Sequence, residues 1–500
     1  MSKQATTIGE LKAGGYKVLS VKEEMRGNLL AKIKRSEKLF PGIIGYDRTV
    51  IPALVNALLS KHDFILLGLR GQAKTRILRG LVAFLDEAIP TIQGCEINDN
   101  PFAPVCKSCR KKVAEQGDRT TVAWITREER FREKLATPDV TIADLIGDVD
   151  PIKAAAQRLT YADEEVIHYG IIPRTNRGIF AINELPDLPP RIQVGLLNIM
   201  EERDLQIRGF PVRIPLDILI VYTANPEDYT NRGNIITPLR DRIDSQIMTH
   251  YPETMEDSLA ITEQEAWTRR DGQCEMVVPR YIEELIEEIA FQARKSEFVD
   301  QKSGVSARLP ISARENLVSN MERRAVLTGE KKVYPRICDF SALVPAVAGK
   351  IELVYEGEQE GPTQVAKRLI GQAVNKLFTD HFPLAHKEKR RKEAAATTLD
   401  TPYKEVLGWF SEGNSIVVSD EMPASEYLAA LDRVRGLKEV AREYFSVKSP
   451  EEQGLVMELV LEGLHQNATL AKENLESRTS YRDMLETMLR GIGETIGGKD

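Results

Sequence analysis

An eight-residue stretch, 68–75, has the composition of a loop that binds the phosphates of a nucleotide. It reads Gly-Leu-Arg-Gly-Gln-Ala-Lys-Thr and directly follows the apolar run 64–67. Glycines let backbone N–H groups turn inward around phosphate oxygens, the lysine reaches the β- and γ-phosphates, and the threonine hydroxyl can hold Mg²⁺. One position departs from the usual pattern, because Ala73 stands where a glycine is expected before the lysine. The candidate nucleotide-binding residues are Gly68, Gly71, Gln72, Ala73, Lys74 and Thr75.

Hydrolysis of a bound nucleotide needs further groups that position the metal and the attacking water. The apolar run 178–182 ends in Asn183 and Glu184, and Glu184 is placed to orient or deprotonate water. An aspartate is expected at position 183 to hold the Mg²⁺ shell. An amide oxygen is a neutral ligand, so the affinity for Mg²⁺ should fall without being abolished. Weak or slow hydrolysis is therefore one open outcome.

Another polar side chain, Asn225, follows the apolar run 218–222 by three residues. If this strand lies beside the one that precedes Glu184, Asn225 could contact the γ-phosphate or the attacking water. Two arginines, Arg240 and Arg242, come next along the chain. Each is either an ordinary surface charge or, in a ring, an arginine finger that reaches the nucleotide of the neighbouring subunit.

Three cysteines, Cys95, Cys106 and Cys109, lie within fifteen residues of one another. Cys106 and Cys109 have the spacing of zinc ligands, but a structural zinc site takes four ligands. His62 or His168 could complete the set, although nothing in the sequence places either of them nearby. Three interpretations stay open: a zinc site, a redox-sensitive thiol pair, or three ordinary loop cysteines.

The elements that must position these residues follow from the apolar pattern. The runs 64–67, 121–125, 178–182 and 218–222 leave room for helices between them, and this predicts a parallel sheet covered on both faces. The segment 75–88 predicts the helix that follows the phosphate loop, with its N-terminus toward the phosphates.

Beyond residue 252 the pattern becomes helical, as in 281–293 and 365–377, and predicts a helical second domain to about Phe382. The charged stretch 386–394 is interrupted by glutamates and lacks aromatic residues, which favours a solvated helix or linker over a nucleic-acid patch. Ser449 and Pro450 predict the start of another helix. The last hundred residues are interpreted as a helical bundle.

Length and composition place the chain among ordinary globular proteins. Its 500 residues suggest two to four domains, and the net charge of −7 gives no general reason to expect nucleic-acid binding. No apolar run approaches the roughly eighteen residues that a membrane helix needs. With five cysteines, an odd number, and a polar N-terminus, we expect a cytoplasmic protein in a reducing compartment.

The order of these motifs resembles the AAA+ ATPases, and within them the branch that holds the magnesium-chelatase small ATPase subunit and the MoxR-type ATPases. The resemblance covers roughly residues 36–330. It is carried by Phe-Pro-Gly-Ile-Ile-Gly at 40–45, Arg70-Gly71, the alanine before Lys74, Asn-Arg-Gly at 176–178, Asn225-Pro226 and Asp241-Arg242.

This resemblance implies an AAA+ P-loop NTPase core with a parallel sheet over 36–255, a helical lid domain over 256–383, and a charged linker with a C-terminal helical region over 384–500, after an N-terminal segment 1–35. It assigns the arginine finger to Arg242 rather than Arg240. It assigns the sensor arginine of the lid to Arg308, with Arg314 as the alternative. It further implies an insert at 152–172 and a hairpin at 204–214, elements that typically act as levers toward a partner.

The same resemblance implies ATP and Mg²⁺ as ligands and a homo-oligomer, usually a hexameric ring. It also implies a partner protein with a von Willebrand A domain, which must be a separate polypeptide because no Asp-x-Ser-x-Ser metal motif occurs in this chain. Chelatase subunits carry a cysteine-containing loop comparable to 95–109, so inheritance explains that loop as well as zinc does.

Three classes of function follow. The first is an ATP-driven motor that remodels a partner protein or complex or inserts a metal into it. The second is an ATP-dependent switch or scaffold with weak hydrolysis, which Asn183 keeps credible. The third, an enhancer-binding transcription activator, is disfavoured because neither a Gly-Ala-Phe-Thr-Gly-Ala loop nor an evident helix-turn-helix occurs.

Overall fold

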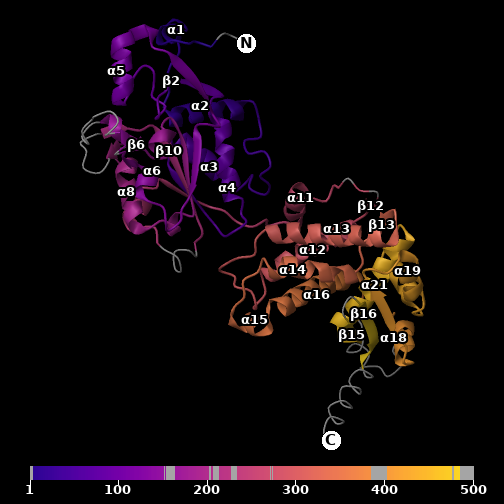
Figure 1. Cartoon of the computed structure of the whole chain (residues 1–500). Coiled ribbons are helices and arrows are strands. Elements are labelled where there is room, and N and C mark those ends of the chain that lie inside the picture. The colour runs from indigo at the N-terminus through magenta and orange to yellow at the C-terminus, as the bar shows by residue number, and fades with distance from the viewer. Residues whose placement is uncertain are drawn as a thin grey trace. The chain divides into compact units, whose positions relative to one another are not determined.

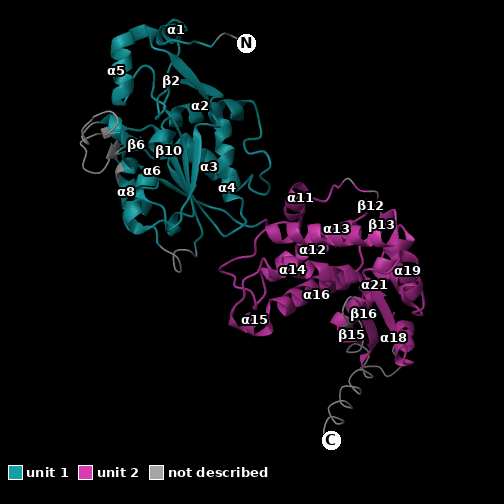
Figure 2. Cartoon of the chain, in the orientation of Figure 1, with its two compact units in different colours: residues 1–251 teal, residues 252–500 magenta. Residues whose placement is uncertain are grey.

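In the computed structural model the chain forms two compact units, residues 1–251 and residues 252–500 (Figures 1 and 2). Each unit is described by itself. The residues described are 4–150, 152–153, 164–201, 204–206, 213–226, 234–270, 272, 274–384, 402–475 and 478–484. Within them no helix is both long and apolar enough to cross a membrane. The four-part division expected from the sequence remains a prediction, and the charged stretch 386–394 lies outside the described residues.

The first unit combines short helices with a central sheet. Its α-helices are α1 (Ile8–Ala13), α2 (Val21–Lys34), α3 (Val50–Leu59), α4 (Lys74–Gly80), α5 (Lys107–Gln116), α6 (Ile142–Leu145), α8 (Pro190–Glu201) and α10 (Thr237–Asp241). Its strands are β1 (Phe64–Leu67), β2 (Ala88–Ile92), β3 (Val122–Thr126), β4 (Phe131–Leu135), β5 (Gly147–Val149), β6 (Ile167–Tyr169), β7 (Gly178–Asn183), β8 (Asp204–Gln206), β9 (Arg213–Pro215), β10 (Ile218–Ala224) and β11 (Ser245–Met248).

Five strands form one parallel sheet in the order β11-β1-β10-β7-β4. In its register Leu67 lies opposite Ala224, and Tyr222 lies opposite Ile182. The carboxyl ends of β1, β10 and β7 are therefore level with one another. The phosphate loop and the two polar strand ends therefore all follow the carboxyl ends of neighbouring strands.

Both faces of this sheet are buried, which explains its continuous apolar strands. Because side chains alternate along a strand, Phe64 and Leu66 of β1 pack with α2, α3 and α4, whereas Ile65 and Leu67 join the core that includes α6 and α8. Figure 1 shows these two groups of helices on opposite sides of the sheet. The expected doubly covered parallel sheet is confirmed.

One strand of the parallel sheet differs from the sequence prediction. The run 121–125 was expected in this sheet, but as β3 it pairs antiparallel with β2 in a separate two-stranded sheet. The edge position beside β7 belongs instead to β4, which reads Phe-Arg-Glu-Lys-Leu. An edge strand of a sheet has partly solvated side chains, so charged residues are compatible with it.

The helix after the phosphate loop is also shorter than the predicted 75–88. Helix α4 ends at Gly80, a 3₁₀ turn follows from Leu81 to Phe84, and β2 begins at Ala88. A β-carbon on Gly80 would lie 3.2 Å from Cδ1 of Phe40. Close packing of Phe40 thus favours glycine here, although glycine weakens a helix.

The second unit is mainly helical. Its α-helices are α11 (Met255–Glu265), α12 (Arg280–Ala293), α13 (Arg308–Thr328), α14 (Val344–Ala348), α15 (Tyr355–Glu360), α16 (Pro362–His381), α18 (Lys404–Ser411), α19 (Ala424–Asp432), α20 (Leu437–Tyr444) and α21 (Pro450–Gln466). Its strands are β12 (Glu275–Met276), β13 (Lys332–Val333), β14 (Ile416–Ser419), β15 (Leu470–Leu475) and β16 (Arg478–Asp483). The helices expected at 281–293 and 365–377 lie within α12 and α16.

The C-terminal region is helical as expected, with one addition. Helix α21 begins at Pro450, and the Oγ atom of Ser449 accepts a hydrogen bond from the Glu452 amide at 3.1 Å, the predicted cap. The addition is a three-stranded antiparallel sheet in the order β14-β16-β15. This sheet was not anticipated, although Ile416, Val417 and Val418 are β-branched residues that favour strands.

Candidate nucleotide site and cysteine cluster

The backbone of the phosphate loop turns through two residues with positive φ. Gly71 has φ +76° and Ala73 has φ +58°, so each adopts the left-handed conformation. Residues in this conformation beside right-handed neighbours direct successive N–H groups to one side, and such a concavity binds anions. For a residue with a β-carbon, such as Ala73, this conformation is unfavourable by roughly 1–3 kcal/mol.

Glycine is required at the first position of the loop. A β-carbon on Gly68 would lie 1.9 Å from Oγ1 of Thr249 and 2.1 Å from Oε1 of Gln72. These two side-chain atoms are themselves 2.7 Å apart and hydrogen bonded. Gly68 therefore allows the start of the loop to lie directly against the end of β11.

Tyrosines fix the middle of the loop from outside. The hydroxyl of Tyr46 is 3.0 Å from the carbonyl oxygen of Gln72, and the hydroxyl of Tyr251 donates to the carbonyl oxygen of Arg70 at 2.9 Å. Burial raises the pKa of Tyr46 to about 12, so it remains a neutral donor at physiological pH. The loop is thereby held in shape by its neighbours.

Lys74 lies inside the loop. The residue is only 7% exposed, and its Nζ donates to the carbonyl oxygens of Gly68 and, at 3.0 Å, Leu69. The ammonium group of Lys74 therefore lies buried against the backbone of the loop, where a positive charge can meet an anionic ligand. Thr75 follows at the start of α4 and is half-buried.

Asn183 and Glu184 sit at the end of β7 and are joined to β10 through Thr223. The buried Thr223 hydroxyl donates to Oδ1 of Asn183 at 3.3 Å and accepts from the Glu184 amide at 3.0 Å. Glu184 has φ +56°, which turns the chain sharply after the strand. Asn225 directly follows β10, so it leaves the sheet at the same edge.

The candidate arginines differ in their partners. Arg242 contacts Glu201 through Nε at 2.9 Å and the carbonyl oxygen of Pro238 through Nη1 at 3.0 Å, whereas Arg240 is exposed. In the second unit, Arg308 is exposed at the start of α13. Arg314 is largely buried and pairs with Glu283 of α12.

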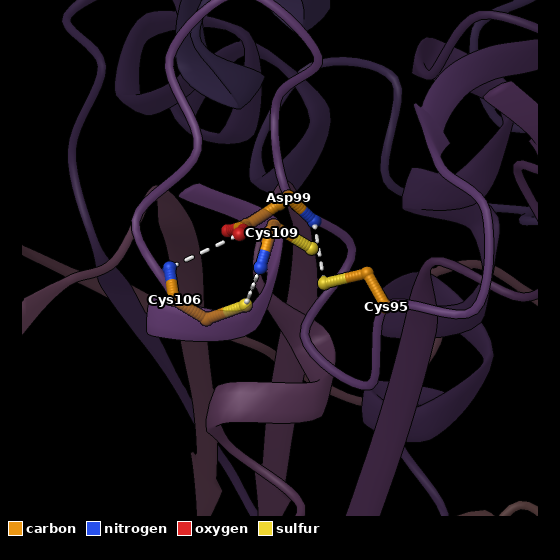
Figure 3. Close-up of side chains that lie close together, drawn as sticks. All are labelled: Cys95, Asp99, Cys106 and Cys109. Atoms are coloured by element: carbon orange, nitrogen blue, oxygen red, sulfur yellow. Dashed lines mark hydrogen bonds between the residues drawn. The ribbon is translucent and has the colours of Figure 1, made fainter. Parts of the chain in front are cut away.

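The three clustered cysteines meet around an acid. Cys95, Asp99, Cys106 and Cys109 have one ligand-type atom each, and these atoms lie within 4.8 Å of one another (Figure 3). The expected histidines are not part of the group: His62 pairs with Ser245 at 2.7 Å, and His168 is an exposed residue of β6. Thiol hydrogen bonds from Cys106 and then Cys109 hold the pKa of Cys95 well below that of an ordinary thiol, and burial raises the pKa of Asp99 to about 7.

Several residues that shape these sites escaped the sequence analysis. Tyr46, Thr223 and Thr249 are far from the loop along the chain, so no local motif pointed to them. Asp99 had a signal, because it lies in the Asn-Asp-Asn-Pro turn between the cysteines. A carboxylate four residues after one cysteine could have been considered as a fourth ligand.

No family model matches the chain. The archaeal Lon protease of Thermococcus kodakarensis is 28% identical over 185 residues, which are 33% of this chain, so the chain spans only 28% of that relative's length. The solved complex between subunits BchI and BchD of magnesium chelatase is 18% identical with a TM-score of 0.34, and the match covers 71% of this chain and 98% of the other. NtrX from Brucella abortus in complex with ATP is 12% identical with a TM-score of 0.34, covering 59% and 56%.

The fold follows from the strand order β11-β1-β10-β7-β4 and from the glycine-containing loop directly after β1. This is a parallel α/β fold with a glycine-containing loop directly after a central strand. The helical second unit agrees with the expected fold class.

Proposed function

We propose that the chain binds ATP with Mg²⁺ and hydrolyses it, and that hydrolysis drives the remodelling of a partner protein or complex or the insertion of a metal into it. The observation that carries this proposal is the convergence of three strand ends. The loop after β1, Asn225 after β10, and Asn183 with Glu184 after β7 all leave one edge of a parallel sheet in level register. Ligands bind at the carboxyl edge in sheets of this kind.

The residues present fit a triphosphate. The tight start of the loop at Gly68 and the inward-turning backbone at Gly71 and Ala73 form a concavity for phosphate oxygens, and Lys74 adds the positive charge. Thr75 and Asn183 would hold Mg²⁺, which neutralises the charge that develops on the phosphates. Glu184 would orient or deprotonate water, and Asn225 would hold that water or the γ-phosphate.

A ring would complete the site. We propose a hexamer in which Arg242 stabilises the transition state in the neighbouring subunit after exchanging its contact with Glu201. In the lid, Arg308 is a better sensor candidate than Arg314 because Arg314 is already paired with Glu283. As in the family it resembles, the partner would be a separate von Willebrand A protein.

Asn183 supports a second candidate function, a switch that binds ATP and hydrolyses it poorly. Its Oδ1 already accepts from Thr223, and a neutral amide attracts Mg²⁺ less than a carboxylate does. Both functions require ATP binding, so they separate on turnover alone.

Steady-state phosphate release, measured over a series of Mg²⁺ concentrations, distinguishes the motor from the switch. For a motor, Glu184→Gln should lower turnover by about 10²–10⁴-fold while ATP binding persists, because only the general base is lost. Asp187→Asn, which changes the half-buried acid three residues later, serves as the matched control. Equal turnover in wild type and Glu184→Gln, with ATP still bound, would contradict the motor proposal and favour the switch. Absence of ATP binding in wild type would remove both proposals.

The ring is tested separately by light scattering and by comparing two nearby arginines. ATP should shift the protein to a hexamer-sized species. Arg242→Ala should reduce turnover by about 10³-fold without weakening ATP binding, whereas Arg240→Ala should leave turnover near that of wild type. A monomer under all nucleotide conditions would contradict the role of Arg242.

A further inference from the structure

The cysteine cluster of the first unit is compact enough to hold one metal ion. Three sulfur atoms and one carboxylate oxygen lie within 4.8 Å of one another (Figure 3). A tetrahedral zinc ion, with Zn–S of about 2.3 Å and Zn–O of about 2.0–2.2 Å, places its ligands roughly 3.5–3.8 Å apart. Each pair therefore has to close by no more than about 1.3 Å around such an ion.

Asp99 provides independent evidence for a ligand. It is fully buried, and its Oδ2 atom accepts a hydrogen bond from the Cys106 amide at 3.0 Å. The other oxygen, Oδ1, is buried and has no hydrogen-bond partner. A buried carboxylate oxygen without a partner is unfavourable, and coordination to a cation would satisfy it.

The sulfur atoms are also arranged as metal-bound thiolates usually are. The Asp99 amide donates to Sγ of Cys95 at 3.4 Å, and the Cys109 amide donates to Sγ of Cys106 at 3.3 Å. Such hydrogen bonds orient the ligands of a metal and stabilise their charge. Cys106 is the N-cap of the ten-residue helix α5, whose N-terminus favours negative charge.

We propose that Cys95, Asp99, Cys106 and Cys109 bind a single structural Zn²⁺ ion, with the carboxylate of Asp99 as its fourth ligand. Thiolates select soft or borderline ions such as zinc over Mg²⁺ or Ca²⁺. A four-iron cluster keeps its ligands on separate irons and thus farther apart than this group allows. Four protein ligands and the burial of Cys106 and Cys109 leave no open position for chemistry.

The ion would fasten the loop after β2 to the start of α5. That loop is attached in turn to the segment before β7, because Asn98 donates to the carbonyl oxygen of Arg174 at 3.0 Å and Asn176 donates to that of Ile97 at 3.0 Å. These contacts lie at the amino end of β7, whereas Glu184 follows its carboxyl end. The zinc site is thus independent of the proposed nucleotide chemistry.

The metal content of the full chain, purified without chelator, tests this proposal directly. We expect about one zinc per chain in wild type and in the control Cys274→Ser, and less than a tenth of that in Cys95→Ser and Cys109→Ser. Circular dichroism shows whether each variant is folded. Wild type without zinc, iron in place of zinc, or zinc that both cysteine variants retain would overturn the proposal.

Cobalt substitution of the wild-type chain and of two Asp99 variants tests the fourth ligand. Bound Co²⁺ should show the intense ligand-field bands of a tetrahedral site with thiolate charge transfer. Asp99→Cys should shift these bands to longer wavelength, and Asp99→Asn should lower the affinity for zinc more than about tenfold. Spectra and affinities that are the same in all three proteins would exclude Asp99 as a ligand.

Discussion

A buried ion pair fastens helix α2 to the segment that precedes β4 of the parallel sheet and offers a sharp test of the fold. Both oxygens of Glu24 accept from the guanidinium of Arg130 at 2.7 Å, and Oε1 also accepts from the Asp86 amide at 2.6 Å. Glu24 is 5% exposed and Arg130 is 1% exposed. Nε of Arg130 further donates to the carbonyl oxygen of Arg177, directly before β7.

The substitution Glu24→Gln keeps the shape of the side chain and removes its charge. Its Oε1 can still accept from the Asp86 amide, but its NH₂ group faces another donor. The buried guanidinium then loses the carboxylate to which it is hydrogen bonded. Removing one partner of a buried ion pair costs about 3–5 kcal/mol. For a unit of this size, this corresponds to a fall of roughly 6–20 °C in its unfolding temperature.

Calorimetric and urea unfolding of the full chain should measure this loss, with Glu133→Gln as control. Glu133 pairs with Arg79, whose side chain is 63% exposed, and surface pairs contribute less than about 1 kcal/mol. The double variant Glu24→Gln/Arg130→Met should be more stable than Glu24→Gln alone, because the unpaired charge is gone. A loss below about 1 kcal/mol for Glu24→Gln, or full additivity in the double variant, would refute this reasoning.

Three other predictions concern single side chains. Ala73→Gly should keep ATP binding and change the unfolding free energy by less than about 1 kcal/mol. Ala73→Val should lower the unfolding free energy by more than this, because a β-branched residue tolerates φ +58° poorly. Urea unfolding of the two variants distinguishes these outcomes. Burial raises the pKa of Tyr46 to about 12, so as pH rises above 10 this hydroxyl ionises first in the unfolded chain, and the free energy of unfolding should fall between pH 10 and 12. Over that interval Tyr46→Phe should lose about 2–3 kcal/mol less of its unfolding free energy than wild type does. Equal pH slopes for the two proteins would contradict this prediction. Ser449→Ala should cost about 1 kcal/mol by thermal unfolding, because the cap of α21 is lost, whereas Ser449→Asp should cost little.

The apolar runs in the sequence predicted the strands whose side chains are buried on both faces of the sheet. β1, β7 and β10 lie inside the sheet with both faces covered, so their apolar runs were clear. β4 escaped notice because an edge strand needs no apolar run, and its charged residues resemble a loop. β3 was placed in the wrong sheet because a short apolar run does not reveal its partner.

Only those residues of the candidate site that lie within a short sequence motif could be predicted. The phosphate loop and Glu184 are local patterns, but the contacts of Tyr46, Thr223 and Thr249 depend on strands and loops far apart along the chain. Similarly, the cysteine spacing left a zinc site as one of three interpretations, whereas Asp99 became a candidate ligand only when its buried and unpartnered oxygen could be seen. Tertiary contacts of this kind leave no period or spacing in the sequence.

Equilibrium titration of the full chain with ATP and Mg²⁺, in wild type and in Lys74→Ala, tests the central claim most directly. Lys17→Ala, which removes an exposed lysine, is the control. We predict saturable binding of one ATP per chain in wild type and Lys17→Ala, and at least about a 100-fold weaker affinity in Lys74→Ala, since a charge-assisted contact inside the loop is lost. Absence of binding in wild type, or equal affinity in Lys74→Ala, would contradict the claim that residues 68–75 form a nucleotide site.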